Sequence, residues 1–222
     1  MNIHRLSVTK TARYCTIGEL NNGTKEIWFI CHGYGQLANE FIGDFELLDD
    51  GTRYIVAPEA LSRFYLRNGL KEIGASWMTR LERDDEINDY LSFLGKVYQE
   101  VMKEANGFSQ KGIRTVLLGF SQGTATATRW FESMGGNFDN LVLWGGHLAS
   151  ETNLMNGHYD HSDIWLIYGV EDKYLLPLYF EEDIKLLTKY SIKHRLMSFN
   201  GGHIIDGTTL DKLAKELPRS GV

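Results

Sequence analysis

Short runs of apolar residues recur along the chain, and segments with apolar residues at helical spacing separate most of them. A short, continuously apolar run is typical of a strand that is buried on both faces of a parallel sheet. Runs of this kind lie at residues 26–31, 53–57, 116–118, 140–144, 164–168 and 194–199. Residues 13–20 alternate apolar and polar side chains instead, which predicts a further strand with one wetter face.

The segments between these runs predict helices at residues 36–48, 84–105, 122–134, 177–190 and 208–217. The last helix begins with a capping box, in which Thr208 is followed three residues later by Asp211. Strands that alternate with helices indicate an α/β protein with a mostly parallel, doubly wound sheet of about seven strands and helices on both faces. Because no linker, repeat or low-complexity segment interrupts the pattern, we expect a single domain over residues 1–222.

The sequence does not decide the structure around two segments. The turn at residues 21–24 favours a hairpin between strands 13–20 and 26–31, although an open α/β sheet could insert a later strand between them. Residues 59–82 have no clear periodicity apart from a predicted turn at Asn68-Gly69. A loop of this length in a compact domain is more often functional than idle, and whether it acts as a mobile lid is open.

Composition and charge narrow the classes of protein that this chain can be. With 43% hydrophobic and 23% charged residues in 222, the chain has the composition of an ordinary globular protein. The formal net charge of −6 argues against a nucleic-acid partner, which would require a basic face to neutralise phosphates. No run approaches the ~20 apolar residues of a membrane span.

The first residues and the cysteines bear on the cellular compartment. Residues 1–10 lack the apolar core of a signal peptide, so we expect a cytoplasmic protein. Cys15 and Cys31 both lie in predicted strands and are interpreted as buried free thiols, with a disulfide as the less favoured alternative. Neither the cysteines nor the histidines form a metal-binding motif, and we expect no metal and no cofactor.

The strand at 116–118 ends in Gly119-Phe120-Ser121-Gln122-Gly123, and a helical pattern follows directly. Strand, G-x-S-x-G and helix is the context of a nucleophile elbow, a tight turn that strains the serine backbone and lifts its side chain clear of the sheet. Glycines on either side leave room where a Cβ would collide with the neighbouring strand or helix. The alternative is a glycine-rich turn in which Ser121 only caps the helix.

Further reactive side chains follow later strands, at the carboxyl-end edge where ligands bind in open parallel sheets. Asp172 follows the sixth predicted strand, and His203 follows the seventh after two glycines. A serine nucleophile needs a base within hydrogen-bond reach, and the base needs a carboxylate that orients it. The order Ser121, Asp172, His203 is the order of the α/β-hydrolase triad.

Each of these roles has a local rival. Glu171 neighbours Asp172, which could otherwise be a helix cap, and Asp163 is a weaker candidate acid because it precedes its strand. His147 is the rival base, but it follows an earlier strand than the acid and breaks the order, so we interpret it as pocket lining. His32 is interpreted as a structural histidine that orders the glycine loop after it.

An oxyanion formed at the serine needs two N–H donors. One comes from the residue after the nucleophile, here Gln122. The other is expected from the loop after the 26–31 strand, where Gly33 and Gly35 allow the backbone to turn its amides inward. Tyr34 is the best-placed donor in that loop.

Four motifs, in this order, resemble the carboxylesterase/phospholipase family of small α/β-hydrolases, which includes acyl-protein thioesterases. They are His-Gly-x-Gly, Gly-Phe-Ser-Gln-Gly, Tyr-Gly-x-x-Asp-x-x-x-x-Pro and Gly-His, and the resemblance spans about residues 26–217. It implies the α/β-hydrolase fold, with Ser121, Asp172 and His203 as the triad. The implied oxyanion hole consists of the Tyr34 and Gln122 amides.

The resemblance also bears on the topology and on the pocket. It implies that strand 53–57 lies between strands 13–20 and 26–31, against the hairpin. Thr124 stands where a third glycine is common in the family, and Trp-Gly-Gly-His at 144–147 replaces a more usual Ser-Gly ending. Trp77 resembles a tryptophan that these enzymes carry before a helix. The residues expected to line the substrate pocket are Tyr34, Trp77, Met78, Trp144, His147, Leu175 and Tyr65.

These residues predict a serine carboxylic-ester hydrolase that forms an acyl-enzyme on small or medium acyl esters. The same triad would serve an acyl thioesterase or a lysophospholipase, and the catalytic residues do not decide between them. A function of another class is that of a catalytically silent, ligand-binding hydrolase fold. The expected partner is a small-molecule ester or thioester, and both a monomer and a homodimer stay open.

Overall fold

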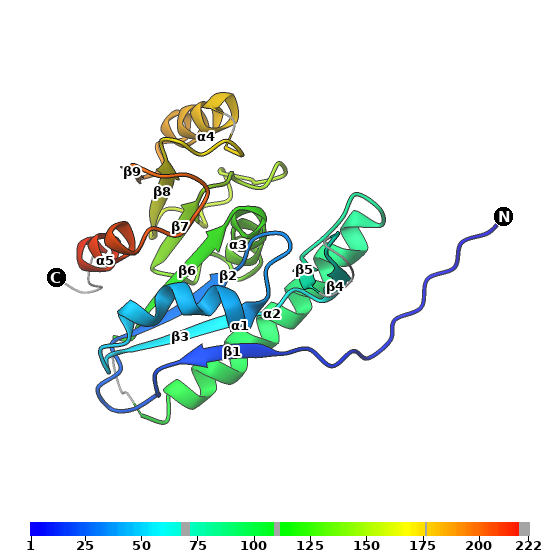
Figure 1. The fold of residues 1–222 in the computed structure, drawn as a ribbon, viewed down its shortest axis with the longest axis horizontal. Coiled ribbons are helices and arrows are strands. Elements are labelled where there is room, and N and C mark those ends of the chain that lie inside the picture. The colour runs from blue at the N-terminus through cyan, green and yellow to red at the C-terminus, as the bar shows by residue number, and fades with distance from the viewer. Residues whose placement is uncertain (68–71, 109–111, 176, 218–222) are drawn as a thin grey trace.

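Seven strands form the central sheet of the computed structural model, which describes residues 1–67, 72–108, 112–175 and 177–217 (Figure 1). In spatial order they are β1 (Tyr14–Ile17), β3 (Arg53–Pro58), β2 (Glu26–Cys31), β6 (Arg114–Phe120), β7 (Asn140–Trp144), β8 (Asp163–Gly169) and β9 (His194–Phe199). β1 pairs antiparallel with β3, and the other neighbours pair in parallel. The mostly parallel α/β sheet predicted from the sequence is therefore confirmed.

The strand order resolves the question raised by the turn at 21–24. β3 lies between β1 and β2, so the hairpin is wrong and the insertion implied by the family resemblance is confirmed. Burial explains the outcome, because β2 is buried along its whole length and needs a strand on each side. β1 is partly exposed and takes the edge of the sheet.

Helices cover both faces of the sheet, as predicted (Figure 1). One layer contains α2 (Arg83–Ala105), α3 (Gln122–Ser133) and α4 (Pro177–Lys189). The other contains α1 (Ala38–Phe41), the 3₁₀ helix η1 (Ile42–Leu48) and α5 (Gly207–Glu216). Within the described part of the chain, no helix combines the length and the apolar character needed to cross a membrane.

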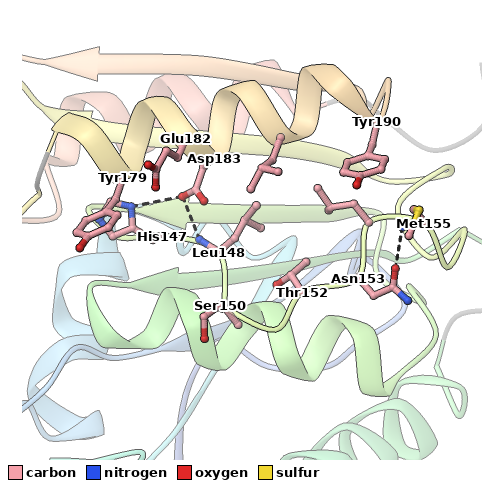
Figure 2. A pocket seen from close by; sticks show the side chains of 13 residues that line it. His147, Leu148, Ser150, Thr152, Asn153, Met155, Tyr179, Glu182, Asp183 and Tyr190 are labelled. Carbon is pink, nitrogen blue, oxygen red and sulfur yellow. Dashed lines mark hydrogen bonds and ion pairs between the residues drawn. The ribbon is translucent and has the colours of Figure 1, made fainter.

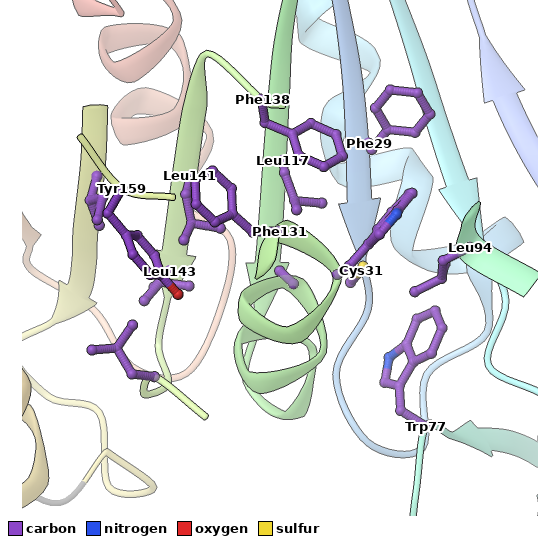
Figure 3. Close-up of a cluster of buried hydrophobic side chains, with 14 of the residues drawn as sticks. Phe29, Cys31, Trp77, Leu94, Leu117, Phe131, Phe138, Leu141, Leu143 and Tyr159 are labelled. Atoms are coloured by element: carbon purple, nitrogen blue, oxygen red, sulfur yellow. The ribbon is translucent and has the colours of Figure 1, made fainter. Parts of the chain in front are cut away.

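Successive side chains of a strand point to opposite faces, and this alternation divides the core into two layers. Phe29 of β2 packs against Trp130 of α3, whereas the neighbouring Trp28 belongs to the layer formed with η1 and α5. Figure 3 shows the first layer, where Phe29 and Phe131 flank Phe138. The sheet thus has a packed core on each side and is a rigid support for residues at its strand ends.

Both cysteines are free, as the sequence predicts. Cys31 is fully buried at the end of β2, and burial raises the pKa of its thiol. Cys15 is only partly buried, which corrects the expectation that both thiols are enclosed.

Residues 36–48 do not form the single α-helix predicted from their apolar spacing. One α-helical turn, α1, leads into η1, a 3₁₀ helix of seven residues. The buried residues Ile42, Phe45 and Leu48 are three apart, which matches the three residues per turn of a 3₁₀ helix. Leu47 does not share this spacing and is 49% exposed.

The segment 59–82 contains a small second sheet that the sequence did not reveal. β4 (Ser62–Tyr65) and β5 (Ile73–Ser76) pair antiparallel, with Phe64 opposite Gly74. The predicted turn at Asn68-Gly69 lies outside the described residues. β5 also bonds to the loop after β2, because the Gly35 amide donates to the Ala75 carbonyl at 2.9 Å.

The start of α5 differs from the predicted capping box. The N-cap is Asp206, whose Oδ1 accepts hydrogen bonds from the Thr209 amide at 2.8 Å and from the Thr209 hydroxyl at 2.6 Å. Thr208 lies inside the helix, and Asp211 pairs with Lys215 instead of reaching back. An aspartate caps as well as a threonine, and the two candidates are only two residues apart.

Candidate active site

Ser121 lies in the tight turn between β6 and α3 with φ 54° and ψ −119°. The flanking glycines are required by space. A Cβ at Gly119 would lie 2.2 Å from the Gly123 carbonyl oxygen, and a Cβ at Gly123 would lie 2.1 Å from the Cys31 carbonyl oxygen. The Ser121 amide donates to the Trp144 carbonyl at 2.9 Å, which fixes the turn to the end of β7. The backbone strain at the serine therefore has structural support on both sides.

Thr124 accounts for one departure from the family pattern. Its hydroxyl donates to the Ser121 carbonyl at 2.7 Å and accepts from the His147 amide at 3.0 Å. A Cβ at Gly146 would lie 2.3 Å from the Thr124 Oγ1, so the threonine and this glycine fit each other. The unusual residues at 124 and 146 are thus one coupled feature, in which Thr124 links the elbow to the segment after β7.

Asp172 and His203, the predicted acid and base, are in direct contact. The Nδ1 of His203 lies 2.7 Å from the Oδ2 of Asp172, and the Asp172 side chain is buried. The other carboxylate oxygen accepts from the amides of Tyr174 and Leu175 at 2.8 and 3.2 Å. Because an ionised carboxylate only accepts, Nδ1 carries the proton and Nε2 is left as the basic nitrogen.

The loops that carry this pair are joined by backbone contacts. The Glu171 amide donates to the Gly201 carbonyl at 2.9 Å, and a Cβ at Gly169 would lie 2.3 Å from the same oxygen. Glu171, the rival acid, is exposed, and Asp163 lies at the start of β8, where it pairs with Lys193 at 2.6 Å. The structure therefore places neither rival carboxylate against His203.

Ser121 and His203 line one cleft of about 250 Å³. The ring of His203 lies between those of Phe120 and Tyr174, with centroid distances of 4.8 and 5.0 Å. Gly145 packs against Asp172 and His203. A Cβ at this position would lie 3.4 Å from both the Asp172 carboxylate and the His203 ring. Tyr174 was not anticipated from the sequence, and its place two residues after Asp172 is the signal that could have indicated it.

The two predicted oxyanion donors lie beside the serine. Gln122 is the first residue of α3, and the first amides of a helix have no partner within the helix. In the loop after β2, a Cβ at Gly33 would lie 3.1 Å from the Ser121 Cβ, so this loop is adjacent to Ser121. The Gly33 and Gly35 amides are bonded within the protein, whereas the Tyr34 amide has no partner among the described residues.

The side chain of Gln122 has a second role that the sequence did not suggest. Its Oε1 accepts from the Trp77 amide at 3.2 Å, and its Nε2 donates to the Met78 carbonyl at 3.0 Å. These bonds hold the segment after β5 against the elbow. A long amide side chain at the first position of the elbow helix is the signal that could have indicated this bridge.

His32 is a structural histidine, as predicted. Its Nδ1 lies 2.8 Å from the Gly33 carbonyl oxygen, and its Nε2 accepts from the Ala60 amide at 3.0 Å. Burial lowers the pKa of His32 and favours the neutral ring that this pair of bonds requires. The histidine thereby fixes the start of the loop after β2.

Most of the residues expected to line the pocket lie elsewhere. Trp77 and Trp144 are fully buried, and their indole N–H groups donate to the carbonyls of His32 at 2.8 Å and Ile204 at 2.9 Å. These two tryptophans are therefore core residues that hold loops, which corrects the prediction of a tryptophan-lined pocket. Their apolar bulk is used inside the two core layers instead.

Of the other residues expected to line the pocket, some are also in the core and one is exposed on another strand. Leu175 is 7% exposed and belongs to the core, while Met78 is partly buried, with its sulfur 3.8 Å from Arg129. Tyr65 is 62% exposed on β4. His147 is the one predicted pocket residue, among those described, that lines the cleft with Ser121.

A second cavity, of about 620 Å³, lies between α4 and the segment 147–155 (Figure 2). His147 and Leu148 line both this cavity and the cleft of Ser121, so the two spaces adjoin. Residues 148–162 have neither an apolar run nor helical spacing, so local periodicity does not indicate this cavity. The carboxylate of Asp183 on α4 lies 3.3 Å from the His147 Nδ1 and accepts from the Leu148 amide at 3.1 Å.

Comparison with known proteins gives a consistent result. A family model described as Phospholipase/Carboxylesterase matches residues 17–219. Esterase PE8 aligns over 94% of this chain and 100% of its own, with 19% identity and a TM-score of 0.69. A phospholipase/carboxylesterase from Dyadobacter fermentans covers 95% of this chain and 98% of its own, with 19% identity and a TM-score of 0.67.

Acyl-protein thioesterase 2 from Zea mays is similar to the same extent. It aligns over 92% of this chain and 97% of its own, with 16% identity and a TM-score of 0.68. A search of the curated proteins found no match. At these identities the solved structures show a shared fold, and the family model shows the family.

Proposed function

This chain belongs to the phospholipase/carboxylesterase family of α/β-hydrolases, and we propose that it hydrolyses carboxylic esters through a serine acyl-enzyme. The observation that carries the proposal is the 2.7 Å contact between His203 and Asp172 in a cleft that His203 shares with Ser121. A strained serine, a histidine base and a buried carboxylate are the three parts that such a mechanism needs.

The reaction begins with attack of the Ser121 Oγ on the ester carbonyl carbon while the His203 Nε2 takes the serine proton. The tetrahedral oxyanion is stabilised by the amides of Tyr34 and Gln122, and Asp172 stabilises the imidazolium. His203 then protonates the departing alcohol, which leaves an ester between Ser121 and the acyl group. Water, activated by the same histidine, releases the acid and restores the serine.

The direct test of the nucleophile is labelling by a fluorophosphonate probe together with turnover of p-nitrophenyl acetate. Ser121→Ala should abolish the labelling and reduce turnover to the background rate. Ser191→Ala is a matched control, because Ser191 also has a positive φ of 57° but lies at the end of α4 outside the cleft. Labelling that persists in Ser121→Ala would overturn the assignment.

The acyl group and the type of bond are decided by a substrate series. p-Nitrophenyl esters and acyl thioesters of increasing chain length should be compared by kcat/KM on the purified protein. A preference for thioesters at every length would reassign the activity to a thioesterase on the same triad. An intact protein that neither reacts with the probe nor turns over any member of the series would instead be a catalytically silent, ligand-binding hydrolase fold.

A further inference from the structure

The cavity beside α4 has a buried acidic group with unused hydrogen-bonding capacity. Asp183 is 7% exposed and lines the cavity. Its Oδ2 accepts from the Leu148 amide and faces the His147 Nδ1 (Figure 2). Its Oδ1 has no hydrogen-bond partner among the described residues. This oxygen is not one of the fully buried unpartnered atoms, so it is open to the cavity and can accept from a ligand group that donates.

The charges around the cavity point to a cationic donor. Glu182, next to Asp183 on α4, is a second carboxylate among the lining residues, and the described lining contains neither lysine nor arginine. The nearby Lys185 pairs with Glu181, which does not line the cavity. His147 is the basic side chain of the described lining and faces the Oδ2 of Asp183. A neutral hydroxyl would satisfy one oxygen, but two carboxylates without a lysine or an arginine favour a positive charge and disfavour an anion.

The position of the cavity links it to catalysis. His147 and Leu148 line both the cavity and the cleft of Ser121, so a substrate bound at the serine lies next to the cavity. The ring of Tyr179 on α4 lies 5.7 Å from the His147 ring and lines the same cavity. Such a ring adds apolar contact for a carbon chain that crosses from one space to the other.

We propose that this cavity binds the non-reacting end of the ester substrate and selects a protonated amine there. In this arrangement Asp183 accepts an N–H donor of the ammonium group through Oδ1, and Glu182 adds a second negative charge. The inference rests on the proposed esterase activity and specifies its substrate class as esters with an amine at a distance from the scissile bond.

The experiment compares esters that differ only at the remote end. On the acyl side, the substrates are the p-nitrophenyl esters of 6-aminohexanoate, of heptanoate and of the monoanion of pimelate. On the alcohol side, they are 6-aminohexyl acetate and heptyl acetate. In at least one of the two sets, the amine ester should exceed the uncharged ester in kcat/KM by about tenfold or more, the size expected for a charge-assisted hydrogen bond. The pimelate ester should be the poorest acyl substrate.

Three variants test whether the preference for the amine ester arises in the cavity. Glu182→Gln and Asp183→Asn should each reduce the ratio of amine to uncharged kcat/KM several-fold, because each removes one negative charge from the lining. Glu181→Gln removes a charge from the same helix outside the cavity and should leave the ratio unchanged. The ratio is insensitive to a general loss of folded protein, and Glu182→Gln serves if Asp183→Asn does not fold.

The outcomes separate this inference from the proposed function. Turnover of the heptanoate ester with no preference for the amine in either set would overturn the inference and leave the esterase assignment intact. A preference that all three variants retain would place the amine elsewhere and would also overturn it. Absence of turnover and of fluorophosphonate labelling would refute the esterase itself.

Discussion

Ser121 is held in a backbone conformation that costs an L-residue about 1–3 kcal/mol. Its amide bonds to the Trp144 carbonyl, and its carbonyl accepts from both the amide and the hydroxyl of Thr124. Each of these partners lies in or next to an element of the buried core. The strain therefore persists because the surroundings fix both sides of the residue, and its result is an Oγ presented at the end of the sheet.

The choice between two adjacent carboxylates gives a prediction at the residue scale. Asp172→Asn should lower kcat by about 10³–10⁴, because the amide can no longer hold the His203 tautomer and stabilise its cation. Glu171→Gln should retain activity, since the Glu171 side chain is exposed and only its backbone bonds to the histidine loop. Steady-state kinetics on p-nitrophenyl acetate checks both variants. The reverse pattern would move the acid to Glu171.

At this scale, the sequence predicted that Ser121, Asp172 and His203 lie together, but it did not predict which side chains surround them. Ser121, Asp172 and His203 follow strands in one order, and the carboxyl ends of parallel strands meet at one edge. Trp77 and Trp144 also lie close to strand ends, but their rings point into the core and only their indole N–H groups reach the loops. Side-chain direction at a strand end depends on the loop that follows, and composition does not encode it.

At the scale of elements, the segment after β7 is tied to two helices by Glu151. Its carboxylate pairs with Arg129 of α3 and, at 2.7 Å, with Arg83 at the start of α2. Partial burial opposes ionisation, but hydrogen bonds from Arg129 and Ser150 outweigh it and lower the pKa of Glu151 from 4.5 to about 2. The carboxylate therefore holds the wall of the cavity in place in its charged form.

This pKa predicts how stability depends on pH. A carboxyl whose pKa is lower in the folded state stabilises the fold above its unfolded pKa of about 4.5, and that contribution is lost as the pH falls towards about 2. Glu151→Gln should therefore lower the melting temperature at pH 7, and its difference from the parent should shrink between pH 4.5 and 2. Thermal unfolding monitored by circular dichroism checks this. Glu181→Gln, which removes an exposed 3.7 Å pair, should show little difference at any pH.

The elements differ in how far sequence could predict them. Runs buried on both faces identified the parallel strands, because burial leaves a continuous apolar signal. The hairpin β4–β5 gave no such signal, because its strands are short and only partly buried. Its glycine is explained by a contact with another segment of the chain. A Cβ at Gly74 would lie 2.4 Å from the Gly35 carbonyl oxygen, so the glycine in this strand is required by the loop after β2, against which the strand packs. Contacts between segments far apart in the chain are absent from local periodicity.

At the scale of the whole molecule, the two ends of the sheet carry different groups of side chains. The carboxyl ends of the strands carry Ser121, Asp172 and His203, while a buried ion pair network lies at the opposite end. There Glu26 of β2 pairs with Arg53 at 3.0 Å and with Arg114 of β6. Arg114 also donates to the Leu217 carbonyl at 2.6 Å and so attaches the end of α5 to the sheet.

This separation predicts that stability and catalysis respond independently to a change at the base of the sheet. Glu26→Gln leaves two guanidinium groups without their shared anion, and breaking such a buried pair costs about 3–5 kcal/mol. At this chain length that corresponds to a fall in melting temperature of roughly 6–20 °C. Glu46→Gln, on the exposed side of η1, is the surface control and should change the melting temperature little. Well below its melting temperature, Glu26→Gln should retain the parent kcat per folded molecule, titrated with fluorophosphonate. A parallel loss of kcat in the titrated enzyme would mean that the base of the sheet also sets the geometry of the triad.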